Sequence, residues 1–306
     1  MKTIKQCNRA GGIGLSAKPE MAFLEVLQGV YGQLDFNPIA DGEIHRFKIQ
    51  ADKSGSLNGW YVLYCDGIAS GAFGSWKAGD NHTWSIREPA DHQESEQLRQ
   101  RIEQAKAQRE AERRQKQQAA AELANRWWRN ARRADPEHPY LVAKGVRGHG
   151  LRQRGAELLV PLYANGQLVN LQRISPEGIK RFLAGGQVRE SYSALGAIGY
   201  DKPLCICEGW ATGATLHQAG YTVAAAMNAG NLKPVAMALR SKYPGVKFII
   251  AGDDDRGTEG NPGRTAATSA ALAVGGEVCF PEWPESAPIE LSDFNDLLQW
   301  RTSNGY

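Results

Sequence analysis

In the C-terminal third of the chain, short apolar runs alternate with helical patterns. The apolar runs lie at residues 204–207, 222–227 and 246–252, and the helical patterns at about 210–219 and 234–243. Apolar runs of this length that alternate with helices predict βαβ units and a parallel sheet that is buried on both faces. Right-handed crossovers bring the carboxyl ends of such strands to one edge of the sheet, where open α/β sheets bind their ligands.

Acidic residues follow the first and the last of these runs. Glu208 ends the first run, and Asp253 and Asp255 follow the last. We expect the three carboxylates to meet at one edge of the sheet, where they repel each other unless a cation joins them. Hard oxygen ligands suit Mg²⁺ or Mn²⁺. Asp253 and Asp255 are alternate residues, so in extended backbone they share a face and Asp254 points away.

Four stretches of the sequence resemble the Toprim fold of primases, topoisomerases and related nucleases. Their residues are most similar to those of primases from phages and plasmids. The four stretches are Ile206-Cys207-Glu208-Gly209-Trp210-Ala211-Thr212-Gly213, Ala226-Met227-Asn228-Ala229-Gly230-Asn231-Leu232, Ile250-Ala251-Gly252-Asp253-Asp254-Asp255 and Asp293-Phe294-Asn295-Asp296. The resemblance covers about residues 151–300. It implies a DNA primase in the cytoplasm that makes short RNA primers on single-stranded DNA from nucleoside triphosphates, for a mobile element and with a helicase acting in trans. A metal-dependent Toprim nuclease and a non-catalytic DNA-binding adaptor are the alternatives.

The resemblance also implies roles for individual residues. Glu208, Asp253 and Asp255 would be catalytic and hold the metal ion. Asp293 would be a further ligand or the N-cap of a helix. Gly209 would permit a tight turn and a close approach of phosphate. The remaining expected contacts to nucleotide or template are Arg173, Lys180, Arg181, Thr212, Asn231, Arg256 and Arg264.

Residues 41–85 have a strong β pattern. Turn signals at Asp41-Gly42, Lys53-Ser54-Gly55, Asn58-Gly59 and Asp66-Gly67 predict a small antiparallel sheet of three to five strands. Aromatic and basic side chains interleave here, which is typical of a stacking platform for single-stranded nucleic acid. Arg46, Lys48, Trp60 and Lys77 are the candidate contacts to DNA. The alternative is that the aromatic residues form the core of a small sheet.

Residues 91–134 are rich in Glu, Gln, Ala, Arg and Lys, which predicts a long exposed helix. Its basic residues either face solvent on a spacer or track phosphates, and Trp127 and Trp128 are expected to dock it onto the next domain. The fold class predicted is α/β: a Toprim-type parallel sheet of βα repeats, a small mixed subdomain before it, an N-terminal antiparallel β-rich α+β domain and a long linking helix. The expected domains are 1–90, 91–134, 135–200 and 201–306, with a hairpin at Asn165-Gly166 in the third.

Composition adds few constraints. The net charge of +3 is mild, so any nucleic-acid surface must be a local patch. No apolar run reaches the roughly 20 residues of a membrane span, and the N-terminus has no signal-peptide pattern, so we expect no membrane association. The five cysteines are scattered and form no Cys-x-x-Cys, which predicts reduced thiols in the cytosol and no zinc. The glycines from Gly11 to Gly14 lack the context of a phosphate loop.

Overall fold

The computed structural model describes residues 2–3, 18–50, 52, 55–89 and 92–305. The chain divides into two compact units, Met1–Arg113 and Arg114–Tyr306. The predictions made for Cys7, for the glycines Gly11–Gly14 and for the turn at Lys53-Ser54 concern positions outside the described residues.

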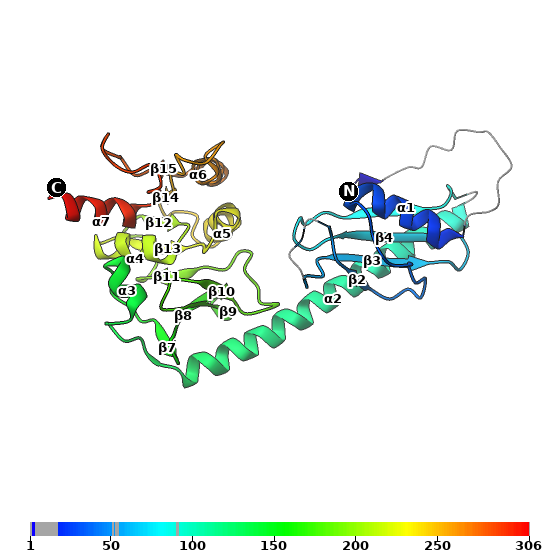
Figure 1. Ribbon diagram of the computed structural model, residues 1–306, viewed down its shortest axis with the longest axis horizontal. Helices are drawn as coiled ribbons and strands as arrows, with labels where there is room; N and C mark the ends of the chain where they lie inside the picture. Colours follow the sequence, from blue (N-terminus) through cyan, green and yellow to red (C-terminus); the bar gives the residue numbers. More distant parts are fainter. Residues whose placement is uncertain (1, 4–17, 51, 53–54, 90–91, 306) are drawn as a thin grey trace. The chain divides into compact units, whose positions relative to one another are not determined.

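The first unit is a five-stranded sheet with one helix on each face (Figure 1). Its strand order is β1-β5-β4-β3-β2; β2 to β5 pair antiparallel and β1 pairs parallel with β5. Helix α1 packs through Phe23 and Leu27 against Tyr61 and Phe73. The elements are β1 (Lys2–Thr3), α1 (Pro19–Tyr31), β2 (His45–Phe47), β3 (Gly59–Tyr64), β4 (Ser70–Ser75), β5 (His82–Ser85) and α2 (His92–Asn130), and α2 continues into the second unit.

The second unit begins with the last part of α2 and an antiparallel sheet, here called sheet B. Its strand order is β10-β9-β8-β7-β6. The β8–β9 connection is Asn165-Gly166, with φ of 50° and 79°, the left-handed backbone that a two-residue hairpin turn requires. The elements are β6 (Arg132–Arg133), α3 (Pro139–Lys144), β7 (Arg152–Arg154), β8 (Glu157–Ala164), β9 (Gln167–Ile174) and β10 (Lys180–Phe182).

A second sheet, sheet C, contains the predicted parallel strands. Its order is β11-β13-β12-β14-β15, in which β11 runs antiparallel to β13 and the other pairs are parallel. Helix α4 packs on one face, and α5 and α6 pack on the other. The elements are β11 (Ser193–Leu195), β12 (Leu204–Cys207), α4 (Trp210–Gln218), β13 (Thr222–Ala225), α5 (Ala229–Lys242), β14 (Phe248–Ala251), α6 (Pro262–Val274), β15 (Glu277–Cys279) and α7 (Phe294–Asn304). The predicted parallel sheet of βα repeats is therefore confirmed.

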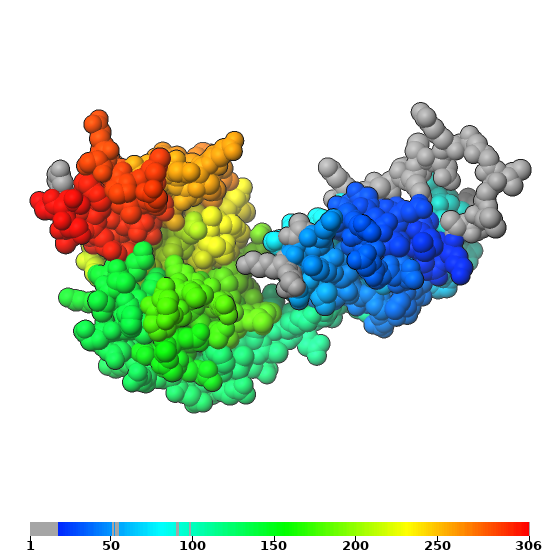
Figure 2. Space-filling model, in the orientation of Figure 1, coloured from blue at the N-terminus to red at the C-terminus, as the bar shows by residue number. Residues whose placement is uncertain are grey.

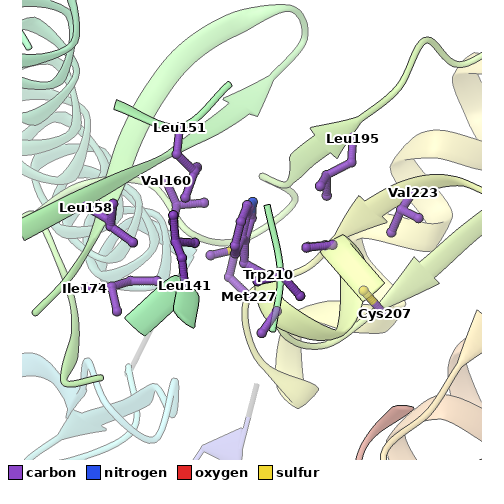
Figure 3. Packing of buried hydrophobic residues seen from close by; sticks show 14 of the residues in the cluster. Leu141, Leu151, Leu158, Val160, Ile174, Leu195, Cys207, Trp210, Val223 and Met227 are labelled. Carbon is purple, nitrogen blue, oxygen red and sulfur yellow. The ribbon is translucent and has the colours of Figure 1, made fainter. Parts of the chain in front are cut away.

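Sheets B and C share one hydrophobic core. Leu158, Val160 and Ile174 of sheet B pack in the same cluster as Cys207 of sheet C and Trp210 of α4 (Figure 3). The other face of sheet B packs under α2 through Leu159 and Leu171, against Ala124 and the two tryptophans. Sheet B therefore has two distinct faces, one toward sheet C and one toward α2. Among the described residues, no helix is both long and apolar enough to cross a membrane.

Candidate active site

The predicted acidic residues lie at the carboxyl ends of two neighbouring strands. β12 and β14 are paired in register, with Cys207 opposite Ala251. Glu208 follows Cys207 directly, and Asp253 follows Ala251 after one glycine. The backbone N–H of Ala229, the first residue of α5, lies near the Glu208 carboxylate and lowers its pKa, against the effect of burial. This helix N-terminus partly compensates the negative charge at the strand ends.

Asp253 is the electrostatic centre of the group. Burial, together with the charges of Glu208, Asp293 and Asp255, raises its pKa to about 8. Burial and Asp255 likewise raise the pKa of Glu208 above its ordinary value. The Oδ1 atom of Asp253 is buried and has no hydrogen-bond partner within the part of the chain that the structure describes. A cation at this edge would neutralise the repulsion and supply the missing partner.

Asp255 is held by the N-terminus of α6. Its Oδ2 accepts a hydrogen bond of 2.8 Å from the N–H of Gly263, and its own N–H donates to Asn261 Oδ1 at 2.9 Å. A Cβ atom at Gly263 would lie 2.7 Å from the carbonyl oxygen of Asp253 and 2.8 Å from Asp255 Oδ2. The helix therefore approaches the two aspartates more closely than any residue with a side chain permits.

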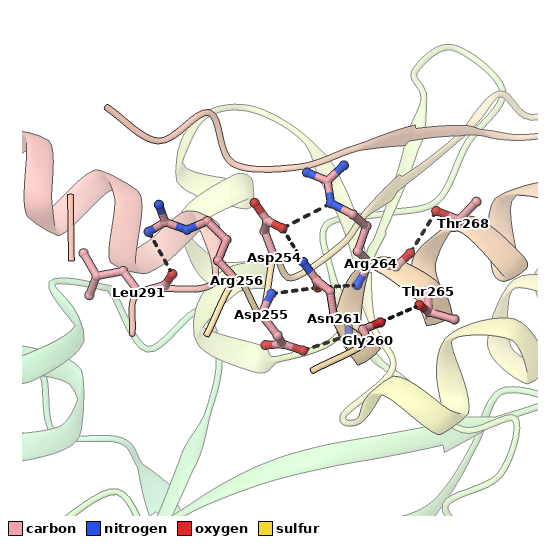
Figure 4. A network of polar contacts seen from close by, with 10 residues as sticks. Asp254, Asp255, Arg256, Gly260, Asn261, Arg264, Thr265, Thr268 and Leu291 are labelled. Carbon is pink, nitrogen blue, oxygen red and sulfur yellow. Dashed lines mark hydrogen bonds and ion pairs between the residues drawn. The ribbon is translucent and has the colours of Figure 1, made fainter. Parts of the chain in front are cut away.

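Asp254 has a structural role, unlike its two neighbours. It is only 5% exposed, and it accepts hydrogen bonds from Asn261 Nδ2 at 2.7 Å and from Arg264 Nε at 3.1 Å (Figure 4). Burial alone would raise the pKa of Asp254, but Arg264 and Asn261 outweigh it and hold the pKa below its ordinary value. As the alternation predicts, Asp254 points away from the carboxylate group and ties α6 to the end of β14.

Asp293 is a helix N-cap, one of the two alternatives considered for it. Its Oδ1 accepts from the N–H of Asp296 at 2.9 Å, so it caps α7. Its Oδ2 accepts from the hydroxyl of Thr212, in the first turn of α4, at 2.9 Å. Its charge still contributes to the raised pKa values of Glu208 and Asp253. The cap and the bond to Thr212 thus fix a fourth carboxylate beside the strand ends.

Two lysines balance this negative charge. Lys180 of β10 is an exposed residue that interacts with Asp293, Asp253 and Glu208, while partial desolvation of its ammonium and the charge of Lys144 hold the pKa of Lys180 below its ordinary value. Lys144, at the end of α3, forms an ion pair of 3.3 Å with Asp296, and its carbonyl accepts from Asn295 at 2.7 Å. The edge of sheet C therefore carries clustered carboxylates with cationic side chains above them.

Among the described residues, no three His, Cys, Asp or Glu side chains are already gathered closely enough to hold a metal ion. The donor set nevertheless fits a hard divalent cation, because its members are carboxylate oxygens whose repulsion raises their pKa values. The unpartnered Oδ1 of Asp253 points to the same group of ligands.

The structure separates the three basic residues predicted to line the template groove. Lys180 pairs in register with Ile174, on the face of sheet B toward sheet C. Arg173 and Arg181 pair with each other and with Leu159, on the face toward α2. Arg173 and Arg181 therefore do not lie beside Lys180, because neighbouring residues of a strand face opposite sides. That they contact nucleotide or template stays a prediction.

Several other expected contacts are engaged within the chain. Asn231 is 3% exposed; its amide donates to the carbonyls of Val188, Ser191 and Ala226 and accepts from Glu190, so it holds a loop in place. Arg256 donates to the carbonyl of Pro288 at 2.7 Å and stacks on Trp283. Arg264 stacks on Phe280 in addition to its bond with Asp254.

Gly209 has a φ of −97°, which any residue adopts, so its backbone does not require glycine. The connection from β12 to α4 is short, as expected, and the close approach of phosphate stays a prediction. A Cβ atom here would lie 3.3 Å from Thr212 Oγ1. What glycine provides at this position is space beside the hydroxyl that holds Asp293.

The aromatic residue expected to form a stacking platform in the first unit is buried, and most of the basic residues beside it are paired within the unit. Trp60 is 3% exposed beneath α2, with Arg109 stacked on its ring, so it belongs to the core, as the alternative had it. Arg46 is paired with Glu112 and stacks on Trp76, and Lys77 is paired with Asp52. Lys48 is exposed. Most of the predicted DNA contacts of this unit are thus committed to its own packing.

Sequence reasoning missed Lys144 and Gly263. Lys144 lies far along the chain from every carboxylate of the site, and only the packing of α3 against α7 brings it there. A signal for Gly263 is its position in the first turn of α6, a few residues after the Asp-x-Asp pattern, where only a residue without a side chain permits the helix to approach the aspartates this closely.

Comparisons with known proteins agree with this geometry. Residues 203–304 match the family model described as Toprim domain. Two proteins named DNA primase TraC, both from Escherichia coli, are 36% and 34% identical to the chain over 274 and 279 residues. These matches cover 85% and 86% of the chain but 19% and 26% of the relatives, so the chain spans about a fifth to a quarter of their length.

One solved structure is also similar, at a TM-score of 0.39 and 15% identity over 57% of the chain and 87% of the other. It comes from a complex of the bacteriophage T7 lagging-strand DNA polymerase with primase domains of two gp4 subunits bound to an RNA/DNA hybrid and dTTP. This similarity is too low to carry an argument. The other two comparisons agree with the resemblance to Toprim primases of plasmid type: residues 203–304 match the Toprim domain model, and most of the chain is similar to part of DNA primase TraC.

Proposed function

We propose that the chain carries the catalytic part of a DNA primase, which joins ribonucleotides into short primers on single-stranded DNA during the replication of a mobile element. The observation that carries this proposal is the group of four carboxylates, Glu208, Asp253, Asp255 and Asp293, at the strand ends of a Toprim domain in a chain similar to DNA primase TraC. The replicative helicase that would act with it in trans is part of the proposal.

The reaction proposed is attack by a 3′-hydroxyl on the α-phosphate of a nucleoside triphosphate. The new P–O bond forms as the bond to pyrophosphate breaks, and the proton of the hydroxyl leaves to a base, a role for which Glu208 is placed. Glu208, Asp253 and Asp255, with Asp293 beside them, would hold Mg²⁺ or Mn²⁺, which when bound supplies charge neutralisation and orientation of the phosphates. Apart from this, the protein contributes to phosphoryl transfer mainly by positioning the reacting groups.

The chain's own groups supply that positioning. Gly263 and Asn261 fix Asp255, and Thr212 fixes Asp293. Lys180, whose ammonium faces the carboxylates, is placed to contact the triphosphate of the incoming nucleotide. Lys144 neutralises Asp296 and keeps further negative charge from accumulating at the edge.

The proposal is tested by incubating the protein with single-stranded DNA, labelled ribonucleoside triphosphates and Mg²⁺ or Mn²⁺, with EDTA as the control. We expect short labelled products that require the metal ion, the template and ribonucleotides. Degradation of the template without synthesis would replace the primase proposal with the nuclease. DNA binding with neither reaction, in the presence of both metal ions, would favour the non-catalytic adaptor.

A second test separates the two faces of sheet B. Lys180→Ala is expected to lower kcat by about 100-fold, because an electrostatic contact to the reacting phosphates is lost. Arg181→Ala removes the same charge from the neighbouring position on the opposite face, and we expect its kcat to stay within about twofold at saturating template. Equal losses in both variants would contradict the assignment of Lys180 to the reaction.

A further inference from the structure

The face of sheet B that points away from the carboxylates carries a row of arginines. Arg133 pairs in register with Arg152, Arg152 with Leu159, Leu159 with Arg173, and Arg173 with Arg181. Cross-strand partners point to the same side, so four arginines lie in one line across the five strands, two on each side of Leu159, which is buried under α2. At about 4.8 Å per strand, the line is about 19 Å long. We call these four residues the arginine row.

The two tryptophans of α2 preorganise the middle of this face. Arg152 stacks on Trp128 at 4.9 Å and donates to the Trp128 carbonyl. Arg154, two residues further on the same face, stacks on Trp127 at 4.1 Å. Stacking uses the flat face of a guanidinium and leaves N–H groups at its edge for an oxyanion. Because the indole faces are already covered, this surface suits a phosphate backbone better than stacked bases.

The ends of the row are open. Arg133 and Arg181 are exposed, and within the part of the chain that the structure describes neither makes an ion pair or a side-chain hydrogen bond. Glu157, paired with Arg173 at 3.3 Å, is the acid next to the row. Residues 126–189 contain twelve Lys and Arg against four Asp and Glu, although the whole chain carries only +3. Figure 2 shows this green segment at the surface of the second unit.

We propose that the arginine row binds the phosphate backbone of single-stranded DNA at a site separate from the carboxylates, on the opposite face of sheet B. This inference rests on the proposed function for the identity of the strand, which would be the template. The contact is independent of base sequence, because it is made to phosphates. Its role is to retain the template while the other face of the same subdomain carries out synthesis.

The test measures binding of a labelled 30-nucleotide oligo(dT) with EDTA present, so that neither metal nor synthesis is involved. Arg133→Ala/Arg181→Ala removes two arginines that support no packing. The control is Arg132→Ala/Arg189→Ala, with the same charge change: both residues are exposed, and Arg132 is the neighbour of Arg133 on the other face of β6. For each variant the dissociation constant is measured as a function of salt concentration.

We expect Arg133→Ala/Arg181→Ala to weaken binding about tenfold at 0.1 M salt and to reduce the slope of log K against log salt by about 1.4, the value for two lost phosphate contacts on a single strand. The control should stay within about twofold. Equal weakening in both variants, or none in the first, would overturn the proposal. Replacing oligo(dT) by a mixed-sequence oligonucleotide should change neither result, and a variant effect confined to one sequence would also overturn it.

This outcome is distinct from failure of the proposed function. If the arginine row binds DNA but the protein makes no primers, the primase proposal is rejected and the proposal that the arginine row binds DNA is kept. If primers are made and Arg133→Ala/Arg181→Ala binds DNA like the wild type, the proposal that the arginine row binds DNA is rejected and the primase proposal is kept. When both hold, the variant should raise KM for template and leave kcat within about twofold.

Discussion

Replacing Asp253 by Asn is expected to abolish primer synthesis while making the metal-free protein more stable. The side chain keeps its size but loses its charge, and with it the capacity to bind a cation strongly. We expect synthesis to fall by more than about 100-fold, the upper end of the loss seen when only an outer-shell partner of a metal ligand is removed.

The gain in stability follows from the raised pKa of Asp253. Its pKa is about 8 in the folded protein and near 3.8 when exposed. The protonated form is favoured by folding, so the stabilising contribution is complete below about pH 4 and is lost as pH rises through 8. At pH 9 the wild type therefore carries the full cost of the buried charge, which the variant does not.

At about 1.4 kcal/mol per pKa unit, even half of this difference amounts to about 2 kcal/mol or more. For a unit of this size that raises Tm by roughly 4–8 °C at pH 9, and the gain should vanish toward pH 4. Calorimetric scans with EDTA at several pH values measure it. A variant that melts below the wild type at pH 9 would contradict the electrostatics described for this site.

Asp254→Asn is the matched comparison one residue away. This carboxylate is buried and paired with Arg264 and Asn261, and its pKa is lowered. Removing the charge leaves the buried groups imperfectly satisfied, at a cost of about 1–3 kcal/mol. Two identical substitutions at adjacent positions should thus change stability in opposite directions.

Gly263→Ala is expected to disrupt the site through a single methyl group. The new Cβ would lie 2.7 Å from the Asp253 carbonyl oxygen, 2.8 Å from Asp255 Oδ2 and 3.0 Å from Asp253 Cβ. These atoms belong to the backbone and to short, fixed side chains, so the aspartates or α6 must move. Overpacking of this kind costs about 1–3 kcal/mol, and a displacement near 1 Å at reacting groups can cost about 100-fold in rate.

Gly257→Ala is the control, in the same loop between β14 and α6. A Cβ at Gly257 would lie 3.6 Å from the nearest atom, the Ile289 carbonyl oxygen, which is an ordinary contact. We expect Gly257→Ala to retain synthesis and Tm close to the wild-type values. If Gly263→Ala retained both as well, the close approach of α6 to the aspartates would not matter for the site.

The parts of the fold that the sequence predicted best are those governed by local pattern. The strands β12 and β14 are apolar runs bounded by polar residues, and their parallel pairing necessarily brings Glu208 and Asp253 to one edge. The start of α5 was predicted less accurately from the sequence. The helix was expected from Pro234, because Gly230 and Asn231 are poor helix formers, yet it begins at Ala229, where the buried amide of Asn231 anchors the first turn to a neighbouring loop.

What the sequence could not provide is the choice between the faces of a sheet. The alternation of Lys180 and Arg181 shows that the two side chains point in opposite directions, but only the packing of sheet B between sheet C and α2 decides which one meets the carboxylates. The same holds for Trp60. Its neighbours in the sequence are typical of a stacking platform, but α2 covers the residue and makes it part of the core. Packing between elements distant in the chain decides both cases.

The central claim, that the carboxylates at the edge of sheet C bind a divalent cation, is tested most directly by titrating Mn²⁺ into the wild type and Asp253→Asn at pH 8. The measurements are Tm and the electron paramagnetic resonance signal of free Mn²⁺. We predict that Mn²⁺ raises the wild-type Tm and is taken up by the protein, while the Asn variant, already more stable without metal, shows neither response. Equal uptake of Mn²⁺ and an equal rise in Tm for both proteins would contradict the claim.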